Sequence, residues 1–411
     1  MELGSKSVSD SAAIAFERVD FLGDEFRRSA QAILSRARAE APVIRHLQLG
    51  TSLVSLLRHA EVKQAYRDYS LFSSFVPEEL RRFELADGFS LLGEDPPEHT
   101  RIRSSIGKVF NAHAIAELEA EVRANCEGLF DSVLAQDEFD AVEDLAAKLT
   151  VSVIAGLVGV PEADHPVVRD WTLRQSAING ITIFLAEEDP RWEECAALTR
   201  GANDEMQAYF EARVDERLDS PRDDILTRFI QSGLDRQEAI SFAKLLVMAG
   251  NETTTNLINN TIRLLIDFPE QQRLLREDPS LAGQAIEEVL RFRGPIRYSV
   301  RTAVRDTEVA GTKIHEGDAV VLWVASANAD ERRYPEPDSF DILRRPTGLL
   351  GFGHGLHACV GSPLARLEAR VFLETLLRRT RFVERTREKM TPLASPIFDG
   401  VTHQFVRFEA S

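Results

Sequence analysis

The ten residues Phe352-Gly353-His354-Gly355-Leu356-His357-Ala358-Cys359-Val360-Gly361 hold three glycines, two histidines and one cysteine. The glycines allow positive φ angles and let the backbone approach a flat partner closely. Ser362-Pro363 follows, and proline suits the first turn of a helix because its missing N–H would be unpaired there anyway. We therefore expect Cys359 at a helix N-terminus, which favours thiolate over thiol. A thiolate on a glycine-rich loop indicates an axial haem ligand.

Three other interpretations of Cys359 are a buried structural thiol, a zinc ligand and a catalytic nucleophile. Zinc is disfavoured because His354 and His357 do not come with paired CxxC or HxxxH ligands, and no partner can be assigned to a nucleophile. The pattern F-G-x-G-x-H-x-C-x-G is more restrictive and resembles the haem-binding loop of the cytochrome P-450 superfamily. The resemblance implies a mainly α fold with small β-sheets (α+β), a long central helix crossing the haem, and haem b with Cys359 as thiolate ligand.

Composition is that of an ordinary globular protein, with 44% hydrophobic and 28% charged residues in a chain of 411. No apolar run approaches the ~20 residues that cross a bilayer, and a net charge of −17 argues against nucleic acid as a partner. The three cysteines are far apart and odd in number, which is typical of a reducing cytoplasm. We expect residues 1–15 to form a flexible tail and residues 16–411 a single P-450 domain.

A helical pattern without proline runs from Asp235 to Phe268, and the unusual run Ala249-Gly250-Asn251-Glu252-Thr253-Thr254-Thr255 lies in its middle. Glycine and three β-branched threonines are poor helix formers, so propensity did not select them. Thr253 can hydrogen-bond back to the Ala249 carbonyl four residues earlier. The run resembles the oxygen-binding groove of the family. This resemblance assigns Thr253 to hold oxygen and help protonate it, and Glu252 to relay protons from solvent.

Asp95-Pro96-Pro97-Glu98 predicts a helix start, with Asp95 as N-cap and Pro96 as the first helical residue. His99 and Arg103 then lie four residues apart on one face of this helix, where they suit an anion. An ordinary solvated pair is the other interpretation. The resemblance makes His99 and Arg103 ligands of the haem propionates, and adds Arg301 and His357 to them.

The spacing of Glu288 and Arg291 places an acid and an arginine three apart on a helix, a weak signal by itself. The resemblance joins them with Arg344 in a buried network behind the haem-binding loop. Apolar runs on either side of Gly50 predict a β-hairpin, and residues 303–324 alternate like short strands.

The substrate implied by the resemblance is a mostly apolar small molecule, such as a terpenoid, steroid, fatty acid or aromatic compound. Arg297 stands where the family commonly has an apolar residue, and we hypothesise that it pairs with an anionic or polar substrate group. A link to a surface acid is the alternative. Family position places the following residues around the substrate: Phe75, Val76, Leu245, Met248, Ala249, Arg297 and Ile397.

The implied reaction converts R–H, O₂, two electrons and two protons into R–OH and water. A separate ferredoxin, of the [2Fe–2S] type, and its reductase are the expected electron source, docking by charge complementarity on the cysteine side. A haem-thiolate peroxygenase or nitric oxide reductase and a haem-based sensor are the alternatives. Candidates for a basic docking patch are Arg101, Lys108, Arg366 and Arg370.

Overall fold

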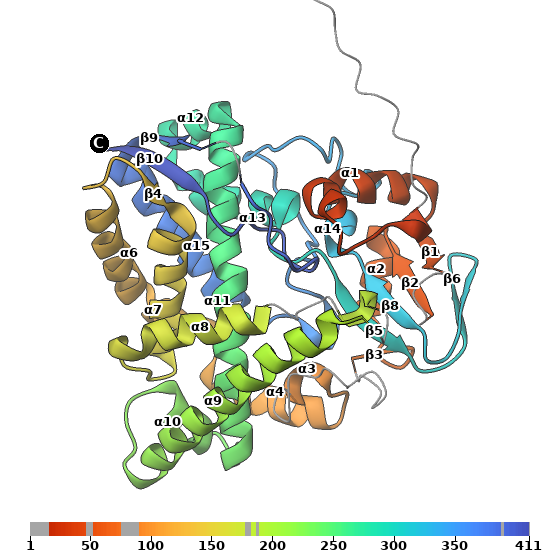
Figure 1. The fold of residues 1–411 in the computed structure, drawn as a ribbon, viewed down its shortest axis with the longest axis horizontal. Coiled ribbons are helices and arrows are strands. Elements are labelled where there is room, and N and C mark those ends of the chain that lie inside the picture. The colour runs from red at the N-terminus through yellow and green to blue at the C-terminus, as the bar shows by residue number, and fades with distance from the viewer. Residues whose placement is uncertain are drawn as a thin grey trace, which may run out of the picture.

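Helices make up most of the fold, and they pack around one long central helix, α11 (Figure 1). The computed structural model describes residues 16–46, 52–74, 90–176, 182–185, 189–387 and 390–410. Its α-helices are α1 (Asp24–Glu40), α2 (His59–Arg67), α3 (Ser90–Gly93), α4 (Glu98–Val109), α5 (Ala112–Glu117), α6 (Glu119–Val133), α7 (Ala147–Leu157), α8 (His165–Ser176), α9 (Arg191–Asp219), α10 (Ile225–Gln231), α11 (Arg236–Asp267), α12 (Pro269–Glu277), α13 (Ala282–Arg293), α14 (Val324–Ala327) and α15 (Ser362–Arg379).

The strands are short and lie mainly on the side of the molecule opposite α6 and α7 (Figure 1). The largest sheet has the order β1-β2-β8-β5-β3. The predicted mainly α fold with small sheets is confirmed. The strands are β1 (Val43–His46), β2 (Leu53–Leu56), β3 (Phe72–Ser73), β4 (Phe139–Asp140), β5 (Ser299–Ala303), β6 (Thr307–Val309), β7 (Thr312–Ile314), β8 (Ala319–Leu322), β9 (Thr380–Arg385) and β10 (Phe405–Ala410).

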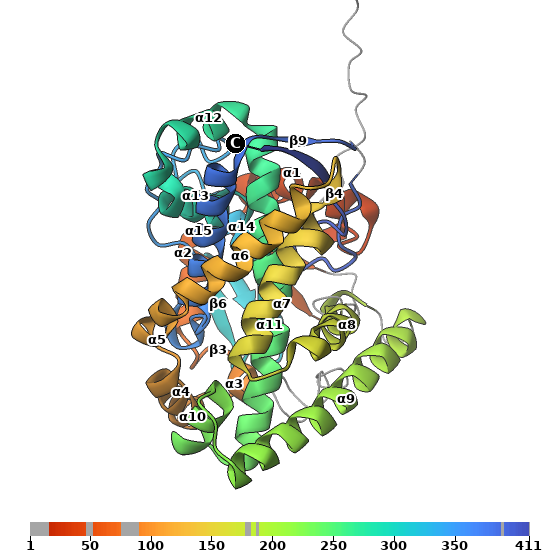
Figure 2. The ribbon, with the colours of Figure 1, turned by 90° about the vertical axis from the view of Figure 1, so that its left-hand side faces the viewer.

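The long helix α11 begins and ends where its sequence predicts. The Asp235 carboxylate accepts a hydrogen bond from the Glu238 backbone N–H, and the Glu238 side chain accepts one from the Asp235 N–H. This capping box satisfies two of the four free donors of the first turn. Phe268 caps the other end, and Pro269 opens α12. Viewed from the side, α9 diverges from the foot of α11 across the molecule (Figure 2).

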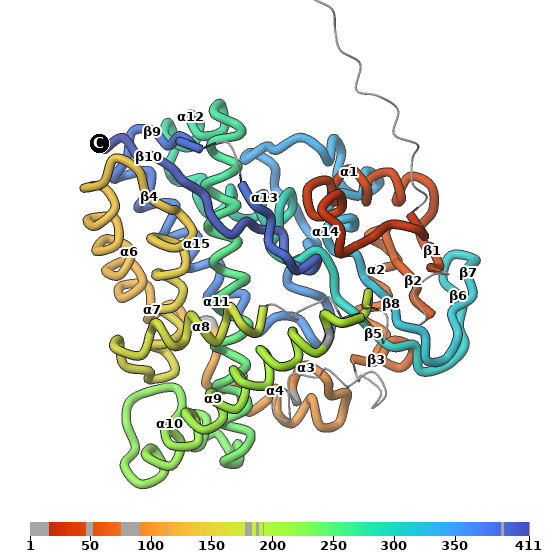
Figure 3. Tube along the Cα trace, in the orientation of Figure 1, coloured from red at the N-terminus to blue at the C-terminus, as the bar shows by residue number. Residues whose placement is uncertain are grey.

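Two strand predictions are confirmed. β1 and β2 pair antiparallel, as expected for a hairpin, although its predicted turn at Gly50 lies outside the described residues. The region 303–324 contains β6, β7 and β8. The C-terminal strands β9 and β10 lie beside β4, far from α1 (Figure 3). Within the described ranges, no helix is both long enough and apolar enough to cross a bilayer.

The predicted start of α4 is wrong by two residues. Glu98 is the first helical residue, and Pro97 rather than Asp95 occupies the N-cap position. The Asp95 carboxylate instead accepts a hydrogen bond from the Ser73 hydroxyl on β3. Asp95 therefore ties the helix entry to the sheet, a partner that lies 22 residues away in sequence.

His46 lies in an aromatic cluster where α1, the sheet and α14 meet. Its ring is 5.4 Å from the ring of Phe16 and 5.4 Å from that of Phe21. Its Nε2 is 2.8 Å from the Ser55 hydroxyl, which also accepts a hydrogen bond from Trp323. Burial lowers the pKa of His46 from 6.5 to about 4, because a charged imidazole is poorly solvated there.

We predict that His46 makes the fold acid-labile. Between pH 6.5 and about 4, His46 is protonated in the unfolded chain and neutral in the folded chain. The free energy of unfolding therefore falls as pH falls. The loss is on the order of 3 kcal/mol across this interval. Urea unfolding at several pH values should show a shallower fall in His46→Gln, whereas the exposed control His113→Gln should keep the wild-type slope. Equal slopes in all three proteins would contradict the prediction.

Candidate functional site

The cysteine loop folds tightly against α2. A short turn, η7 (Gly355–His357), precedes Cys359, whose backbone N–H donates to the Phe352 carbonyl over 2.8 Å. Gly353 and Gly355 have φ angles of 70° and 76°, a region in which residues with a side chain are strained. A Cβ on Gly355 would also lie 2.7 Å from the Tyr66 carbonyl oxygen. The glycines are therefore required by both conformation and contact.

Cys359 is the exposed member of the three cysteines, all of which lie in described residues. Cys126 is buried, and burial raises its pKa to about 11. Burial of its sulfur also raises the pKa of Cys359, although the N–H groups of Gly361 and Ser362 and the charge of Arg103 oppose this rise. The N–H groups at the helix start thus lower the pKa of Cys359 as predicted, but burial outweighs them. A haem iron bound to the sulfur would supply the missing stabilisation, because a thiol that coordinates a metal is deprotonated.

A group of four nitrogen-bearing side chains lies beside the loop: His99, Arg103, Arg301 and His357. The rings of His99 and His357 are 4.2 Å apart, and Arg103 donates to the Ala358 carbonyl over 2.8 Å. Arg301 lies close enough for its charge to lower the pKa of His357, which burial and this charge together bring to about 3. The structure thus brings together residues from α4, β5 and the loop, and we call these four the donor cluster.

The donor cluster fits a haem with its two propionates. Both ring nitrogens of His99 and the Nε2 of His357 are buried without a hydrogen-bond partner. The nearest acid paired with the cluster among the described residues is Asp95, 3.9 Å from His357. Each imidazole carries at least one N–H, and a buried N–H without an acceptor is costly, so this side of the loop suits a ligand that carries carboxylates.

The middle of α11 is open on one side. Ala249 is exposed and Gly250 and Thr253 are half-buried, although the helix is buried from Ala239 to Met248. The Thr253 hydroxyl donates to the Ala249 carbonyl over 2.6 Å, as its spacing predicts. The small residues and the bent-back hydroxyl leave one polar group on an otherwise apolar face.

Glu252 lies on the buried side of α11 and its carboxylate has two partners. It pairs with Arg169 of α8 over 3.1 Å and accepts a hydrogen bond from Asn256 over 3.1 Å. Arg169 also pairs with Glu143 over 2.6 Å, and Glu143 lies in the π-helical turn η3 (Ala141–Ala146). Glu252 therefore shares one guanidinium with a more exposed acid. Sequence analysis missed Arg169, because no motif links α8 to α11.

Glu288, Arg291 and Arg344 form a buried network. Arg291 donates two hydrogen bonds of 2.8 Å to the Glu288 carboxylate, and both side chains are completely buried. Arg344 approaches the same carboxylate at 3.2 Å. The geometry is the bidentate arrangement that favours arginine over lysine.

The predicted substrate residues lie in different environments. Leu245 and Met248 are buried in α11 beside the exposed Ala249. Ile397 packs against the aromatic cluster around Trp323. Phe75 and Val76 lie outside the described residues.

The prediction that Arg297 faces the substrate is wrong. The side chain is buried, with 4% of its surface exposed. Its guanidinium pairs with Asp399 over 3.2 Å and donates to the carbonyls of Pro396 and Phe398. Arg297 therefore anchors the C-terminal segment. This agrees with the alternative of an acid of the chain as partner, although Asp399 is half-buried rather than on the surface.

Three of the four residues of the predicted basic patch are neutralised within the chain. Arg366 pairs with Glu287 over 2.6 Å, and Arg370 pairs with Glu119 over 2.7 Å. Arg101 pairs with Glu98 and Glu238. Lys108 is exposed and has no side-chain partner in the part of the chain that the structure describes. These arginines pair with nearby acids, so their positive charge is largely compensated.

We predict that Gly355→Ala destabilises the cysteine loop by about 2 kcal/mol or more, because it adds both a positive-φ penalty and a backbone clash. Gly351→Ala is the matched control, since its Cβ would meet nothing closer than 3.7 Å. The thermal unfolding temperature and the haem content of the purified protein should fall in Gly355→Ala. Both should stay near the wild-type values in Gly351→Ala. A Gly355→Ala variant with wild-type stability would contradict this account of the loop.

Comparison with known proteins agrees with this site. The family model "Cytochrome P450" matches residues 181–403. The chain is 36% identical to the putative cytochrome P450 YjiB of Bacillus subtilis, over 84% of this chain and 86% of the relative. It is 36% identical to erythromycin C-12 hydroxylase of Saccharopolyspora erythraea, over 79% of this chain and 81% of the relative.

Among solved structures, CYP109E1 of Bacillus megaterium in complex with testosterone superposes with a TM-score of 0.85. It is 30% identical, and the match covers 94% of this chain and 99% of that one. Members of the family hold haem iron through a cysteine thiolate and act as monooxygenases. From its cysteine loop, its central helix and these matches, the chain belongs to the cytochrome P450 family.

Proposed function

We propose that this cytochrome P450 hydroxylates a C–H bond of a bulky, mostly apolar molecule of the steroid or macrolide kind, with electrons from a separate [2Fe–2S] ferredoxin. The observation that carries the proposal is the donor cluster beside Cys359, with its buried ring nitrogens that lack partners. The open stretch of α11 around Ala249 and Thr253 offers a mostly apolar face for a substrate. Two relatives support the substrate class. One hydroxylates erythromycin, and the other was solved with testosterone.

The contacts support the haem roles in this proposal. Cys359 would hold the haem iron, and the donor cluster (His99, Arg103, Arg301 and His357) would hold the two propionates. Bound haem supplies the oxygen-activating chemistry. Glu288, Arg291 and Arg344 hold the polypeptide behind the loop, since the buried Glu288 carboxylate requires both arginines.

Thr253 and Glu252 transfer protons from opposite sides of α11, Thr253 on the open face and Glu252 on the buried one. The Thr253 hydroxyl, held by the Ala249 carbonyl, keeps its lone pairs directed away from the helix and can accept or pass a proton. Glu252 supplies protons from the other side of the helix. Glu252 can give up its ion pair with Arg169 without leaving the arginine charge unpaired. Arg169 then remains paired with Glu143.

A neutral substrate fits the apolar residues of this face. Leu245, Met248 and Ala249 offer no charge, and Arg297 is committed to Asp399. No cation of the predicted pocket within the described residues is left to bind a substrate carboxylate. Steroids and macrolides bury large apolar areas, at roughly 25 cal/mol per Å².

The electron donor docks beside α2 in this proposal. Lys63 and Arg67 have no ion-pair partner among the described residues. They line a surface hollow of about 950 Å³ together with Arg333, and Asp68 is the acid among its lining residues. The α2 backbone touches the cysteine loop, since a Cβ on Gly355 would lie 3.4 Å from the Arg67 Cα. Unpaired cations next to the iron ligand suit an acidic electron carrier.

The oxygen-activation roles predict that Thr253→Ala uncouples electron use from hydroxylation. With a steroid or macrolide that shifts the haem spectrum, product per electron pair should fall on the order of tenfold, with the electrons recovered as hydrogen peroxide. Thr261→Ala removes the same kind of hydroxyl-to-carbonyl bond, of 2.8 Å, two turns further along α11, and should stay coupled.

Full coupling in Thr253→Ala would contradict the role of Thr253. Wild-type turnover that proceeds with peroxide alone and not with a ferredoxin and its reductase would replace the proposal by the peroxygenase alternative.

The docking site predicts that Lys63→Glu/Arg67→Glu weakens binding of an acidic plant-type [2Fe–2S] ferredoxin roughly tenfold at low ionic strength, with the difference shrinking as salt is added. Arg28→Glu/Arg273→Glu is the matched control, because it makes the same change in net charge at two exposed arginines on α1 and α12. Calorimetric titration measures both. Equal weakening in the two double variants, or no binding to the wild type, would rule out this surface.

A further inference from the structure

A small cavity lies between α4, α5, α6, α7 and α10, away from the haem site. Its volume is about 160 Å³. Val109 and Phe110 line it from the C-terminal end of α4, whereas His99 and Arg103 lie near the other end of that helix. Ten residues of helix separate His99 from Val109, which corresponds to roughly 15 Å. The cavity is therefore distinct from the donor cluster.

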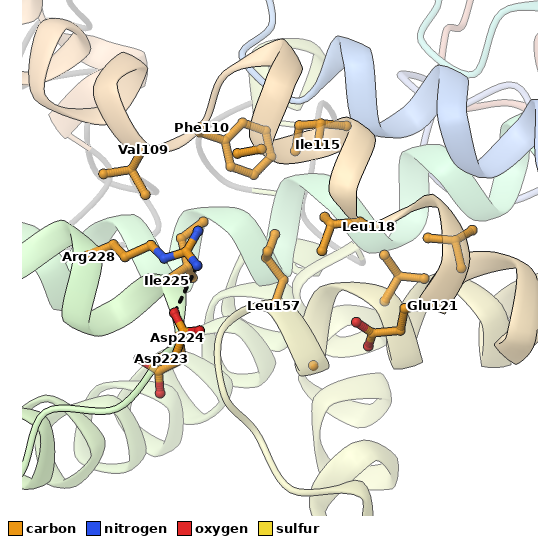
Figure 4. Close-up of a pocket in the computed structure, with 14 residues that line it drawn as sticks. Val109, Phe110, Ile115, Leu118, Glu121, Leu157, Asp223, Asp224, Ile225 and Arg228 are labelled. Atoms are coloured by element: carbon orange, nitrogen blue, oxygen red, sulfur yellow. Dashed lines mark hydrogen bonds and ion pairs between the residues drawn. The ribbon is translucent and has the colours of Figure 1, made fainter.

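Most of the residues that line the cavity are apolar. Phe110 and Ile115 cover one side, and Leu157 and Ile225 lie opposite them (Figure 4). A cavity of about 150 Å³ with such a lining binds benzene in other proteins. The volume here accommodates one six-membered ring.

Gly156 leaves the cavity open toward α7. It lines the cavity near the end of this helix, and a Cβ there would meet only the Glu121 Oε1, at 3.4 Å. Neither φ nor backbone contact requires glycine at this position, and alanine would be a better helix former. The missing side chain instead adds to the space beside Glu121.

The rim of the cavity carries an excess of negative charge. Asp223 pairs with Arg228 over 2.9 Å (Figure 4), and Asp224 pairs with Arg217 over 2.8 Å. Glu121, by contrast, has no hydrogen bond or ion pair to any residue that the structure describes. The Glu121 carboxylate thus lies unpaired at the edge of the mostly apolar cavity.

From the apolar walls and this unpaired carboxylate, we infer that the cavity binds a small amphiphilic organic cation. The ring of the ligand enters between Phe110 and Leu157, and its ammonium group lies against Glu121. The apolar part contributes affinity by leaving water, and the charge selects a cation over a neutral or anionic molecule of the same shape.

Benzyltrimethylammonium is a suitable probe, because its quaternary nitrogen has no lone pair and cannot coordinate iron. Titration of the haem-loaded protein, followed by calorimetry and by the haem absorption spectrum, should show saturable binding with an unchanged spectrum. Glu121→Gln should bind roughly threefold more weakly, as expected for an exposed ion pair. The nearby acid Glu117, on α5, does not line the cavity, so Glu117→Gln should bind as the wild type does.

Filling the cavity gives the second arm of the test. Gly156→Leu should abolish saturable binding, whereas Gly156→Ala should retain it, and the alanine variant keeps the comparison with Glu121→Gln valid if the leucine variant does not fold. The inference is overturned if the wild type shows no saturable binding. It is also overturned if the haem spectrum shifts with the same dissociation constant, or if Glu121→Gln binds as tightly as the wild type.

Discussion

Buried ring nitrogens without hydrogen-bond partners, beside Cys359, are the constraint on which the rest of this structure depends. His99 contributes two such nitrogens and His357 one, and each costs about 1–3 kcal/mol if it stays unpaired. The chain holds them there with three separate elements, α4, β5 and the cysteine loop. A ligand that brings carboxylates removes this cost, so its binding free energy also stabilises the fold. Loop, helix and strand are thus positioned for a partner larger than any side chain.

The central helix divides its two faces between packing and chemistry. Its buried face carries Glu252. An arginine that paired with Glu252 alone would fix this carboxylate in place. Arg169 is instead shared with Glu143, at 2.6 Å, and lies further from Glu252, at 3.1 Å. Removing one partner of a buried pair is costly because it strands the other. A third member lowers that cost, which allows an acid to move a proton without unfolding its surroundings.

Sequence predicted those parts of the site whose partners are close in sequence or fall in a motif. The Thr253–Ala249 bond, the limits of α11 and the contact of Glu288 with Arg291 each span four residues or fewer or depend on a cap. The predictions that Asp95 caps α4 and that Arg297 faces the substrate were wrong, because the partners of these residues come from other parts of the fold. The partners are Ser73 and Asp399. A helix-start pattern specifies which residues can cap, but a hydroxyl from a neighbouring strand can compete for the same carboxylate. Contacts of this kind arise only after the chain has folded.

Surface charge follows the same distinction between local pattern and folded contact. In a chain of net charge −17, an arginine in a motif usually finds an acid, as Arg366 finds Glu287. Counting cations in the sequence therefore overestimates positive surface. What acts on a partner is the charge left uncompensated within a Debye length of about 8–10 Å. Lys63 and Arg67 on α2 lack an ion pair among the described residues, whereas Arg366 and Arg370 on α15 each have one, although the four residues look equivalent in sequence. Glu121 differs in the same way from the paired Asp223 and Asp224.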